Sequence, residues 1–443
     1  MLLTTYILPF IVFLGVLIFI HELGHYLAAR HVGVRVEAFS IGLPPTAWGK
    51  VIGETEYRIS WLPIGGYVKL LGQNLTDEDK NDPRNYASKS ILQRLYILAA
   101  GPFMNLLFAL FFMPLVFWIG IDVPAHLNNT PYLQKIDVGS YAYKLGLQAN
   151  DEIVSVNGIY VNNWENLNNL LNQISPSEKI ILEVDRSGRS VTFSGSALEM
   201  HRAGSMGWHA TLAPIVGGFE NDSPAQKAGF QSGDIIKKIN GQTILDWSEI
   251  SPEIQKIMED NNLSKNSSRK IAVELEREGT LQFLSVIPYL HSESQKWRLG
   301  IGPKISQISR SYSFSDSVLL GSRKLWFLTK STFDFLGQMV QGRGSMKDVG
   351  GPIMIAKVVG DTWKKRKLNQ LLSLLSFISL QLCIFNLLPI PALDGGHIFL
   401  LLIEKLKGGN LSASAKEKIQ MIGFSVLICL MIFVTLKDIN VIG

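Results

Sequence analysis

The chain has 443 residues, of which 47% are apolar and only 18% are charged, and its formal net charge is +5. A disordered chain needs low hydrophobicity and high net charge, so this composition excludes one. The charged fraction lies below the ~25% usual for soluble proteins, and the basic residues do not form the clustered footprint of a nucleic-acid binder. The two cysteines, Cys383 and Cys429, lie in apolar runs and make neither a CxxC site nor a disulfide framework.

Four apolar segments are candidates for membrane spans, because roughly 20 helical residues cross a hydrocarbon core of ~30 Å. The apolar runs cover 7–29, 95–121, 371–388 and 421–436. The first run lacks a basic region before it and a small-residue cleavage site, so we interpret it as a retained membrane helix rather than a signal peptide. The sequence therefore predicts a multi-pass α-helical membrane protein with four transmembrane helices.

Lysine and arginine residues set the expected orientation of these spans. The loop from Arg30 to Arg94 holds nine of them and the short loop from Glu404 to Lys418 holds four, which the positive-inside rule places in the cytoplasm. The long stretch from 122 to about 367 then lies outside, where long domains translocate largely regardless of charge. The basic cluster at 364–367 disagrees with this scheme, because it falls on the outer side.

The long outer stretch contains an internal repeat, whose matched positions run without a gap and indicate a duplication. The matched residues are Ser140, Ala142, Gly146, Asp151, Asn157, Gly158 and Trp164 in the first copy, and Ser223, Ala225, Gly229, Asp234, Asn240, Gly241 and Trp247 in the second. Each copy predicts a short helix, a glycine turn and a strand that ends in an Asn-Gly turn.

The two copies resemble tandem PDZ domains of the circularly permuted bacterial type, and we place these α+β domains at 122–213 and 214–304. A PDZ domain can bind an extended peptide along a sheet edge. The resemblance therefore implies peptide ligands, although the two modules could equally be spacers or size filters that bind nothing tightly. Their position before the third span motivates a further hypothesis, in which the pair excludes substrates with bulky outer domains.

The segment from 305 to 367 predicts an amphipathic helical region. Over 317–340 apolar residues recur at helical spacing, with charged residues between them. Such a helix can lie on the membrane surface or against the helical bundle. The alternative is an ordinary helix that packs on the second repeat.

The first span ends in a candidate metal site, the HExxH motif His21-Glu22-Leu23-Gly24-His25. Residues i and i+4 share one face of a helix, so both imidazoles can reach one metal. Zn²⁺ suits imidazole ligands and activates a bound water, and Glu22 beside it can take the proton. The alternative, two interfacial histidines beside a glutamate that extends to the surface, does not explain the spacing, and ionisable groups at membrane depth are usually functional.

A catalytic zinc needs a third protein ligand. The segment 386–397 interrupts the third span with two prolines and a pair of glycines, NLLPIPALDGGH. A broken helix at membrane depth is tolerated where it lines a cavity or is buried in protein. Asp394 lies here without an obvious local cation, and we favour it as the third ligand. The alternative role for Asp394 is the N-cap of a helix over 397–407.

In combination these motifs resemble the bacterial site-2 proteases over essentially the whole chain. The matching features are HELGH in the first span, Gly101-Pro102-x-x-Asn105 in the second, the repeat pair, and NLLPIPALDGGH in the third. The resemblance implies a zinc ion bound by His21, His25 and Asp394, Glu22 as the catalytic base, and a substrate-binding role for Asn386, Pro389 and Pro391.

The resemblance also bears on the substrate and on the segment 57–71, which looks like a hairpin that turns near Gly65-Gly66. In site-2 proteases a similar segment re-enters the membrane beside the zinc, which implies that Gly65, Gly66 and Tyr67 contact the substrate. The implied substrates are single-span membrane proteins already shortened by another protease, such as an anti-sigma factor, or signal-peptide remnants. The Gly-x-Gly that often precedes this hairpin in the family is Gly42-Leu43-Pro44 here, and proline cannot donate to a strand ladder.

The sequence thus predicts an intramembrane zinc metalloprotease of a bacterial inner membrane, with the repeats in the periplasm, the zinc site toward the cytoplasm, and no nucleic-acid partner. The expected segments are spans over 1–30, 95–121, 368–403 and 419–439, a cytoplasmic or re-entrant β region over 31–94, and a cytoplasmic loop over 404–418. One alternative is a membrane-anchored PDZ scaffold that binds peptides and has an inactive metal site. A transporter is suggested only by the broken third span.

Overall fold

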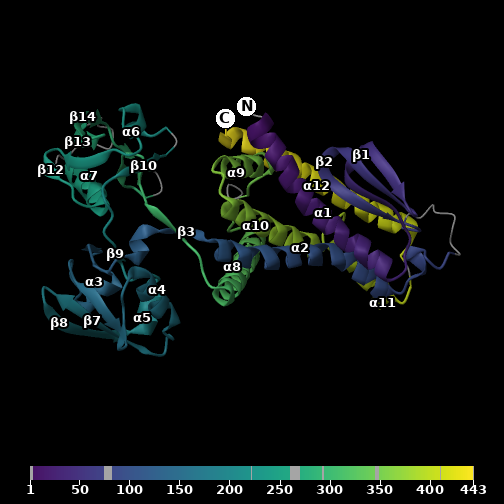
Figure 1. The fold of residues 1–443 in the computed structure, drawn as a ribbon, viewed down its shortest axis with the longest axis horizontal. Coiled ribbons are helices and arrows are strands. Elements are labelled where there is room, and N and C mark those ends of the chain that lie inside the picture. Colours follow the sequence, from purple (N-terminus) through teal and green to yellow (C-terminus); the bar gives the residue numbers. More distant parts are fainter. Residues whose placement is uncertain are drawn as a thin grey trace. The chain divides into compact units, whose positions relative to one another are not determined.

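The structure is a computed structural model that describes residues 3–73, 82–220, 222–259, 270–291, 294–344, 349–409 and 411–442. The chain divides into two compact units, which we describe separately. The membrane unit comprises Met1–Ile121 and Arg310–Gly443, and the repeat unit comprises Asp122–Ser309 (Figure 1).

Four helices of the membrane unit are long and apolar enough to cross a membrane, as the sequence predicts. The spans are Leu3–His31 (η1, Leu3–Ile7, with α1, Leu8–His31), Ile91–Ile119 (α2), Leu368–Leu387 (α10) and Ser414–Ile439 within α12, Ala413–Ile442. Large apolar side chains on these helices face outward, among them Phe111, which is 66% exposed, and Phe433, which is 53% exposed. An apolar outer surface of this kind suits lipid rather than water.

Helix α2 lies at the centre of the membrane unit and contacts α1, α10, α8 and α11. It begins with a capping box between Ser90 and Gln93, which satisfies two of its first amide groups. Where α1 crosses it, Gly24 replaces a side chain, since a Cβ there would lie 2.2 Å from the carbonyl oxygen of Ala100. The two helix backbones therefore approach closely just beside the HExxH motif.

Helices α8 (Phe314–Val340) and α9 (Pro352–Lys364) occupy the stretch before the third span. Helix α8 packs along α2, where Leu325 joins a buried cluster with Ala109 and Met113. Helix α9 is anchored to α12 by Asp438, which is 2% exposed and accepts hydrogen bonds from the backbone amides of Gly351 and Met354. Both helices are thus parts of the bundle.

The third span ends earlier than 403, at Leu387, and the chain from 388 to 393 is not helical. A new helix, α11 (Asp394–Lys407), begins directly at Asp394. Leu393 precedes it and no side chain caps it, so the N-cap role considered for Asp394 is wrong. The break follows from Pro389 and Pro391, since a proline disfavours helical geometry in the residue before it.

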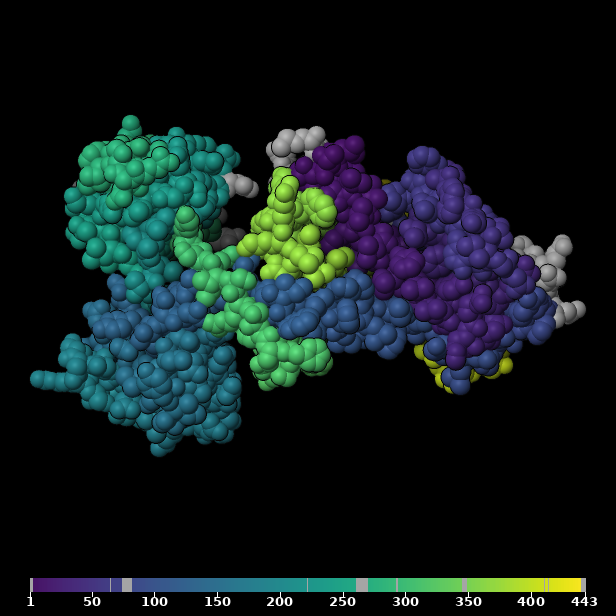
Figure 2. Space-filling model, in the orientation of Figure 1, coloured from purple at the N-terminus to yellow at the C-terminus, as the bar shows by residue number. Residues whose placement is uncertain are grey.

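A β-sheet lies beside α1 and is built from two long strands, β1 (Val36–Ile52) and β2 (Thr55–Leu70) (Figure 1). In the space-filling view the blue-purple atoms of this part of the chain lie against the darker purple atoms of the N-terminal helix (Figure 2). Both strands bend, so they form four antiparallel stretches. Their order across the sheet is 66–70, 36–41, 56–60 and 46–52. Gly42 makes the bend in β1 with a φ of +91°, and a Cβ there would lie 2.7 Å from the carbonyl oxygen of Ser60.

The expected hairpin turn at Gly65-Gly66 is wrong in this structure, because 57–60 and 66–70 pair with opposite sides of 38–41 and not with each other. Gly66 serves a different purpose. A Cβ there would lie 2.6 Å from Cγ2 of Ile18 and 2.9 Å from Cγ of Glu22, so glycine allows the strand to touch α1. The stretch 66–70 is consequently an edge of the sheet beside the HExxH helix.

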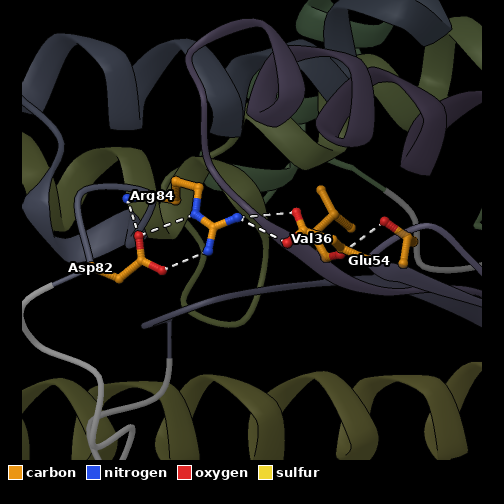
Figure 3. Close-up of polar contacts among 5 residues, drawn as sticks. Val36, Glu54, Asp82 and Arg84 are labelled. Carbon is orange, nitrogen blue, oxygen red and sulfur yellow. Dashed lines mark hydrogen bonds and ion pairs between the residues drawn. The ribbon is translucent and has the colours of Figure 1, made fainter.

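A polar cluster ties the end of this sheet to the segment that leads into α2 (Figure 3). The guanidinium of Arg84 donates to Asp82 and to Glu54, whose carboxylate oxygens lie 3.0 and 2.9 Å from its nitrogens. Nearby, the buried hydroxyl of Thr55 donates to the carbonyl oxygen of Val36 at 2.8 Å. The ion pairs are exposed, so we expect them to orient the turn while contributing only about 0–1 kcal/mol to stability.

The repeat unit contains two copies of one α+β arrangement, each with its own buried core. The sheets have the same order, β6-β5-β7-β8 and β12-β11-β13-β14. The first repeat comprises β4 (Lys135–Ile136), α3 (Tyr141–Leu145), β5 (Glu152–Val156), β6 (Ile159–Tyr160), α4 (Trp164–Gln173), β7 (Lys179–Arg186), β8 (Arg189–Ser196), α5 (Ala197–Ala203) and β9 (Trp208–His209).

The second repeat comprises β10 (Val216–Phe219), α6 (Pro224–Lys227), β11 (Ile235–Ile239), β12 (Gln242–Thr243), η4 (Trp247–Glu249), α7 (Ile250–Glu259), β13 (Ile271–Arg277), β14 (Thr280–Val286), β15 (Tyr289–Leu290), β16 (Trp297–Arg298) and β17 (Ile301–Pro303). Two shorter elements precede the first repeat, β3 (Ile121–Pro124) and η3 (Ala125–Asn128), and β3 pairs with β18 (Gln307–Arg310). The short η2 (Tyr86–Ser88) belongs to the membrane unit.

The matched residues of the two repeats make the same contacts. Asn157 and Asn240 both adopt a positive φ, and each side-chain oxygen accepts from a backbone amide of the neighbouring strand. Asp151 is fully buried and Asp234 is 1% exposed, and each accepts two hydrogen bonds from an arginine on the next strand, Arg186 and Arg277 respectively. The sequence pattern is therefore a pattern of structural contacts.

Replacing Arg277 with alanine is expected to destabilise the second repeat by about 3 kcal/mol, because it leaves the buried carboxylate of Asp234 without its partner. Burial acts to raise the pKa of Asp234, but hydrogen bonds from Arg277 and from the amide of Gln231 lower it below its ordinary 3.8. The carboxylate thus stabilises the fold at neutral pH and loses that contribution as pH falls below 3.8. The difference between wild type and variant should shrink in the same pH range.

Hydrogen exchange of the amides in β11 and β13 of the full-length protein measures this stability. Arg298→Ala is the matched control, since its ion pair with Glu220 is long at 3.6 Å and both side chains are at least 40% exposed. We expect the control to change stability by about 0.5 kcal/mol or less. Equal protection of wild type and Arg277→Ala at neutral pH would contradict the prediction.

Candidate metal centre

Helix α1 presents the two imidazoles of His21 and His25 one turn apart. Their Nε2 atoms are 3.2 Å from each other and the rings meet edge to face. The other ring nitrogen of each histidine, Nδ1, contacts a polar group of α2. Nδ1 of His25 lies 2.8 Å from the carbonyl oxygen of Ile97, and Nδ1 of His21 lies 3.2 Å from the side-chain amide of Asn105. The two Nε2 atoms are therefore directed to one point.

Asp394 reaches the same point from the start of α11. Its Oδ2 lies 3.1 Å from Nε2 of His21 and 3.4 Å from Nε2 of His25. Among the described residues, these three form the group whose His, Cys or carboxylate atoms could hold a metal, all within 4.8 Å of one another. The site joins residues that are more than 360 positions apart in the chain, since the break after α10 brings Asp394 back to α1.

The three atoms fit a metal of the size and preference of zinc. In a tetrahedral site with metal–ligand distances of ~2.0–2.1 Å, neighbouring ligand atoms are about 3.3 Å apart, which agrees with the three observed separations of 3.1, 3.2 and 3.4 Å. Oδ2 of Asp394 is also buried without a hydrogen-bond partner in the described part of the chain. Such an acceptor is costly unless something else satisfies it. Two nitrogens and one oxygen leave a fourth position for water or substrate.

Glu22 lies between the two histidines in sequence and is 8% exposed. It lines a cavity of about 520 Å³ together with His21, His25 and Asp394. The edge stretch of β2 covers one side of it, since Gly66 touches the Glu22 side chain. A buried carboxylate is thus held beside the metal-binding atoms in the same cavity.

The same cavity is lined by most of the substrate-binding residues that the sequence suggests, namely Asn386, Gly65, Gly66 and Tyr67. Pro389 and Pro391 are not among its lining residues. Pro391 instead packs against α12, where a Cβ on Gly423 would lie 2.3 Å from Cβ of the proline. Pro391 therefore packs the loop before Asp394 against α12.

Three residues around the histidines had no role assigned from sequence. A Cβ on Gly101 would lie 2.3 Å from Nε2 of His25, so glycine makes room for that ring. Asn105 faces His21, and the hydroxyl of Ser379 in α10 donates to the Asn105 carbonyl oxygen at 2.8 Å. The available signal was spacing, since 97, 101 and 105 share one face of α2 as 21 and 25 share one face of α1.

A second, larger cavity of about 920 Å³ lies within the repeat unit. The matched tryptophans Trp164 and Trp247 both line it. No group of metal-ligating geometry lies there among the described residues.

Apolar helices long enough to cross a membrane, a partly buried His-His-Asp group and an adjacent buried glutamate are the features of a metalloprotease built into a membrane. The sequence profile of peptidase family M50 matches residues 9–430, and the chain belongs to this family. The regulator of sigma-E protease RseP of Escherichia coli (strain K12) is 33% identical, over 95% of this chain and 95% of that protein. A protein of Pasteurella multocida (strain Pm70) whose name describes a zinc metalloprotease is 31% identical, over 97% of each chain. The protein is accordingly a metalloprotease.

Among solved structures, the chain is similar to the PDZ domain of an SdrC-like protein from Listeria monocytogenes. The sequences are 15% identical, the TM-score is 0.17, and the match covers 21% of this chain and 90% of that one. The tandem PDZ arrangement stays a prediction.

Proposed function

We propose that this metalloprotease is an intramembrane zinc endopeptidase that cleaves single-span membrane proteins within or near the bilayer. The observation that carries the proposal is that His21, His25 and Asp394 converge on one point inside a cavity. The two histidines lie on a candidate span, α1, and Asp394 begins the helix that follows the candidate span α10. The names of the relatives support zinc as the metal.

Glu22 is proposed as the general base. Zinc held by the three ligands would polarise the substrate carbonyl and activate water for attack. The Glu22 carboxylate takes the proton from the attacking water and delivers it to the leaving amine. Its burial in the cavity that the ligands also line supports this role.

The edge stretch 66–70 of β2 is proposed to hold the substrate extended. A transmembrane helix hides its carbonyls in its own hydrogen bonds, so it must unwind before it can be cut. Gly66 and Tyr67 line the cavity at this edge, and Asn386 lines it from the end of α10. Adding a strand to a sheet edge gives an unwound segment main-chain hydrogen bonds without requiring a particular sequence. The proline at position 44 lies outside this stretch, so it does not interrupt the edge.

The substrate class and orientation follow from the relatives and the charge distribution. The names of two relatives refer to regulation of sigma-E. We propose the substrates that the resemblance to site-2 proteases implies, an anti-sigma factor after a first cleavage and, as a second candidate, signal-peptide remnants. The basic loops suggest an inner-membrane protein whose metal site lies toward the cytoplasm and whose repeats lie in the periplasm. There the two repeats, as PDZ domains, would bind peptide or exclude substrates with bulky outer domains.

Metal removal tests the proposal. Treatment of the detergent-purified full-length protein with a zinc chelator should abolish cleavage of a model single-span substrate, because Glu22 alone cannot polarise the carbonyl. Addition of Zn²⁺ should restore cleavage, while Mg²⁺ should not, since two imidazoles and one carboxylate suit zinc rather than magnesium. Cleavage that continues in chelator, with metal analysis showing no zinc, would refute a zinc mechanism.

A further inference from the structure

We propose that Asn105 is a positioning residue for the metal site: its side-chain oxygen accepts the Nδ1–H of His21 and thereby keeps Nε2 of that ring free and aimed at the metal. The inference rests on the proposed zinc site and assigns a role to a polar residue of the second span. Asn105 is fully buried within the apolar part of helix α2 that follows Arg94, where an uncharged but polar amide is costly unless it has a partner.

The stripe formed by Ile97, Gly101 and Asn105 on α2 matches the stripe of histidines on α1. Each position faces one imidazole in a way that fixes it. The carbonyl oxygen of Ile97 accepts from Nδ1 of His25, and Gly101 leaves space for the same ring. Asn105, one turn further, faces Nδ1 of His21 at 3.2 Å. The two rings are therefore held by the same helix, one through a backbone oxygen and the other through a side chain.

The chemistry of a neutral imidazole decides which end of the amide must face His21. If Nε2 donates its lone pair to a metal, Nδ1 carries the ring proton and needs an acceptor. Only Oδ1 of Asn105 can accept, and this oxygen is buried without a hydrogen-bond partner among the described residues while Nδ2 faces the ring. Oxygen and nitrogen of an amide have nearly the same shape, so metal binding favours the orientation in which Oδ1 faces Nδ1–H.

The backbone of α2 at Asn105 is held from α10. The Ser379 hydroxyl, which is fully buried, donates to the backbone carbonyl of Asn105 at 2.8 Å. Asn105 thus contacts the His21 ring of α1 through its side chain and the third span through its backbone carbonyl oxygen. Partners behind a metal ligand commonly contribute 10- to 100-fold in metal affinity.

The test compares Asn105→Leu, which has similar size but no acceptor, with Asn105→Asp, which keeps the acceptor. The measurements are zinc content of the full-length protein, the rate of zinc loss to a chelator, and the visible spectrum after cobalt substitution. We expect Asn105→Leu to lose zinc about 10- to 100-fold faster and to alter the cobalt spectrum, whereas Asn105→Asp stays close to wild type. Ser376→Ala is the matched control, because its buried hydroxyl donates to the carbonyl oxygen of Leu372 within its own helix.

Equal rates of zinc loss from wild type, Asn105→Leu and Asn105→Asp would overturn the inference, as would equal acceleration in both variants. If Asn105→Leu does not fold, Ser379→Ala replaces it, and we expect faster zinc loss by a smaller factor because only the support of Asn105 is removed. Wild-type protein that binds no zinc would refute the proposed function itself, an outcome distinct from the failure of Asn105 alone.

Discussion

Asp394→Ala is expected to remove zinc from the protein and to abolish cleavage. The substitution takes away the oxygen ligand and leaves two imidazoles, which are too few for a catalytic zinc site with three protein ligands. Removing a residue that hydrogen-bonds to a metal ligand typically lowers metal affinity by roughly 10- to 100-fold. Removing the ligand Asp394 itself should lower zinc affinity by more than this. Metal analysis of the detergent-purified variant beside wild type, with one zinc expected per wild-type chain, measures it directly.

His397→Ala is the matched control for this measurement. His397 lies about one turn after Asp394 on α11. Its ring contacts the side chain of Gln420, and it is not part of the metal-binding group. We expect the control to retain zinc. One zinc per chain in both Asp394→Ala and wild type would rule out the three-residue site, whereas no zinc in either protein, with stripping during purification checked, would favour a membrane-anchored scaffold that binds peptides.

The metal-binding group shows which parts of a site can be predicted from sequence. His21 and His25 are four residues apart on one helix, so local geometry alone brings them together. Asp394 could be selected because its helix is broken and because two histidines are an incomplete site. The α2 residues that contact the histidine rings were harder to predict, because these contacts depend on how α1 and α2 are rotated against each other. Gly24 lets the two helix backbones approach and Gly101 leaves room for the His25 ring, and neither contact can be assigned from sequence spacing alone.

The β region shows where sequence reasoning fails. Two adjacent glycines predict a turn, and Gly65-Gly66 were interpreted in that way. In the structure both glycines lie in the extended strand β2, and Gly66 passes within contact distance of Ile18 and Glu22 of α1. Glycine allows close approach as readily as it allows a turn. Only the tertiary structure distinguishes the two uses, and here the difference changes which edge of the sheet faces the metal centre.

The repeats lie between these two cases. The matched residues predicted the duplication, and the Asn-Gly turns have the positive φ values that such turns require. The arginines that pair with Asp151 and Asp234 were not identified, because Arg186 follows its aspartate by 35 residues and Arg277 by 43. The two arginines occupy the equivalent strand in each copy. A search for residues at the same spacing in both repeats cannot find them, because their separation from the aspartate differs between the copies.

Glu22→Gln should separate metal binding from catalysis. The amide has nearly the size of the carboxylate, so the cavity and the three ligands remain in place and the variant should bind one zinc per chain. Glutamine cannot accept a proton from the attacking water, and the loss of a general base typically lowers a rate by about 10²- to 10⁴-fold. Cleavage of a model single-span substrate, measured beside zinc content, gives both quantities from one preparation.

Glu404→Gln is the control for placing a neutral amide at a buried glutamate of the membrane unit. Glu404 is 1% exposed and pairs with Lys416 away from the metal-binding group, so its replacement should affect stability without eliminating cleavage. Because Glu22 is next to His21, loss of zinc in Glu22→Gln would instead indicate a structural role for this carboxylate. Substantial cleavage by a zinc-loaded Glu22→Gln protein would show that another group moves the proton. The combination of full zinc and absent cleavage is the result that assigns the proton transfer to Glu22.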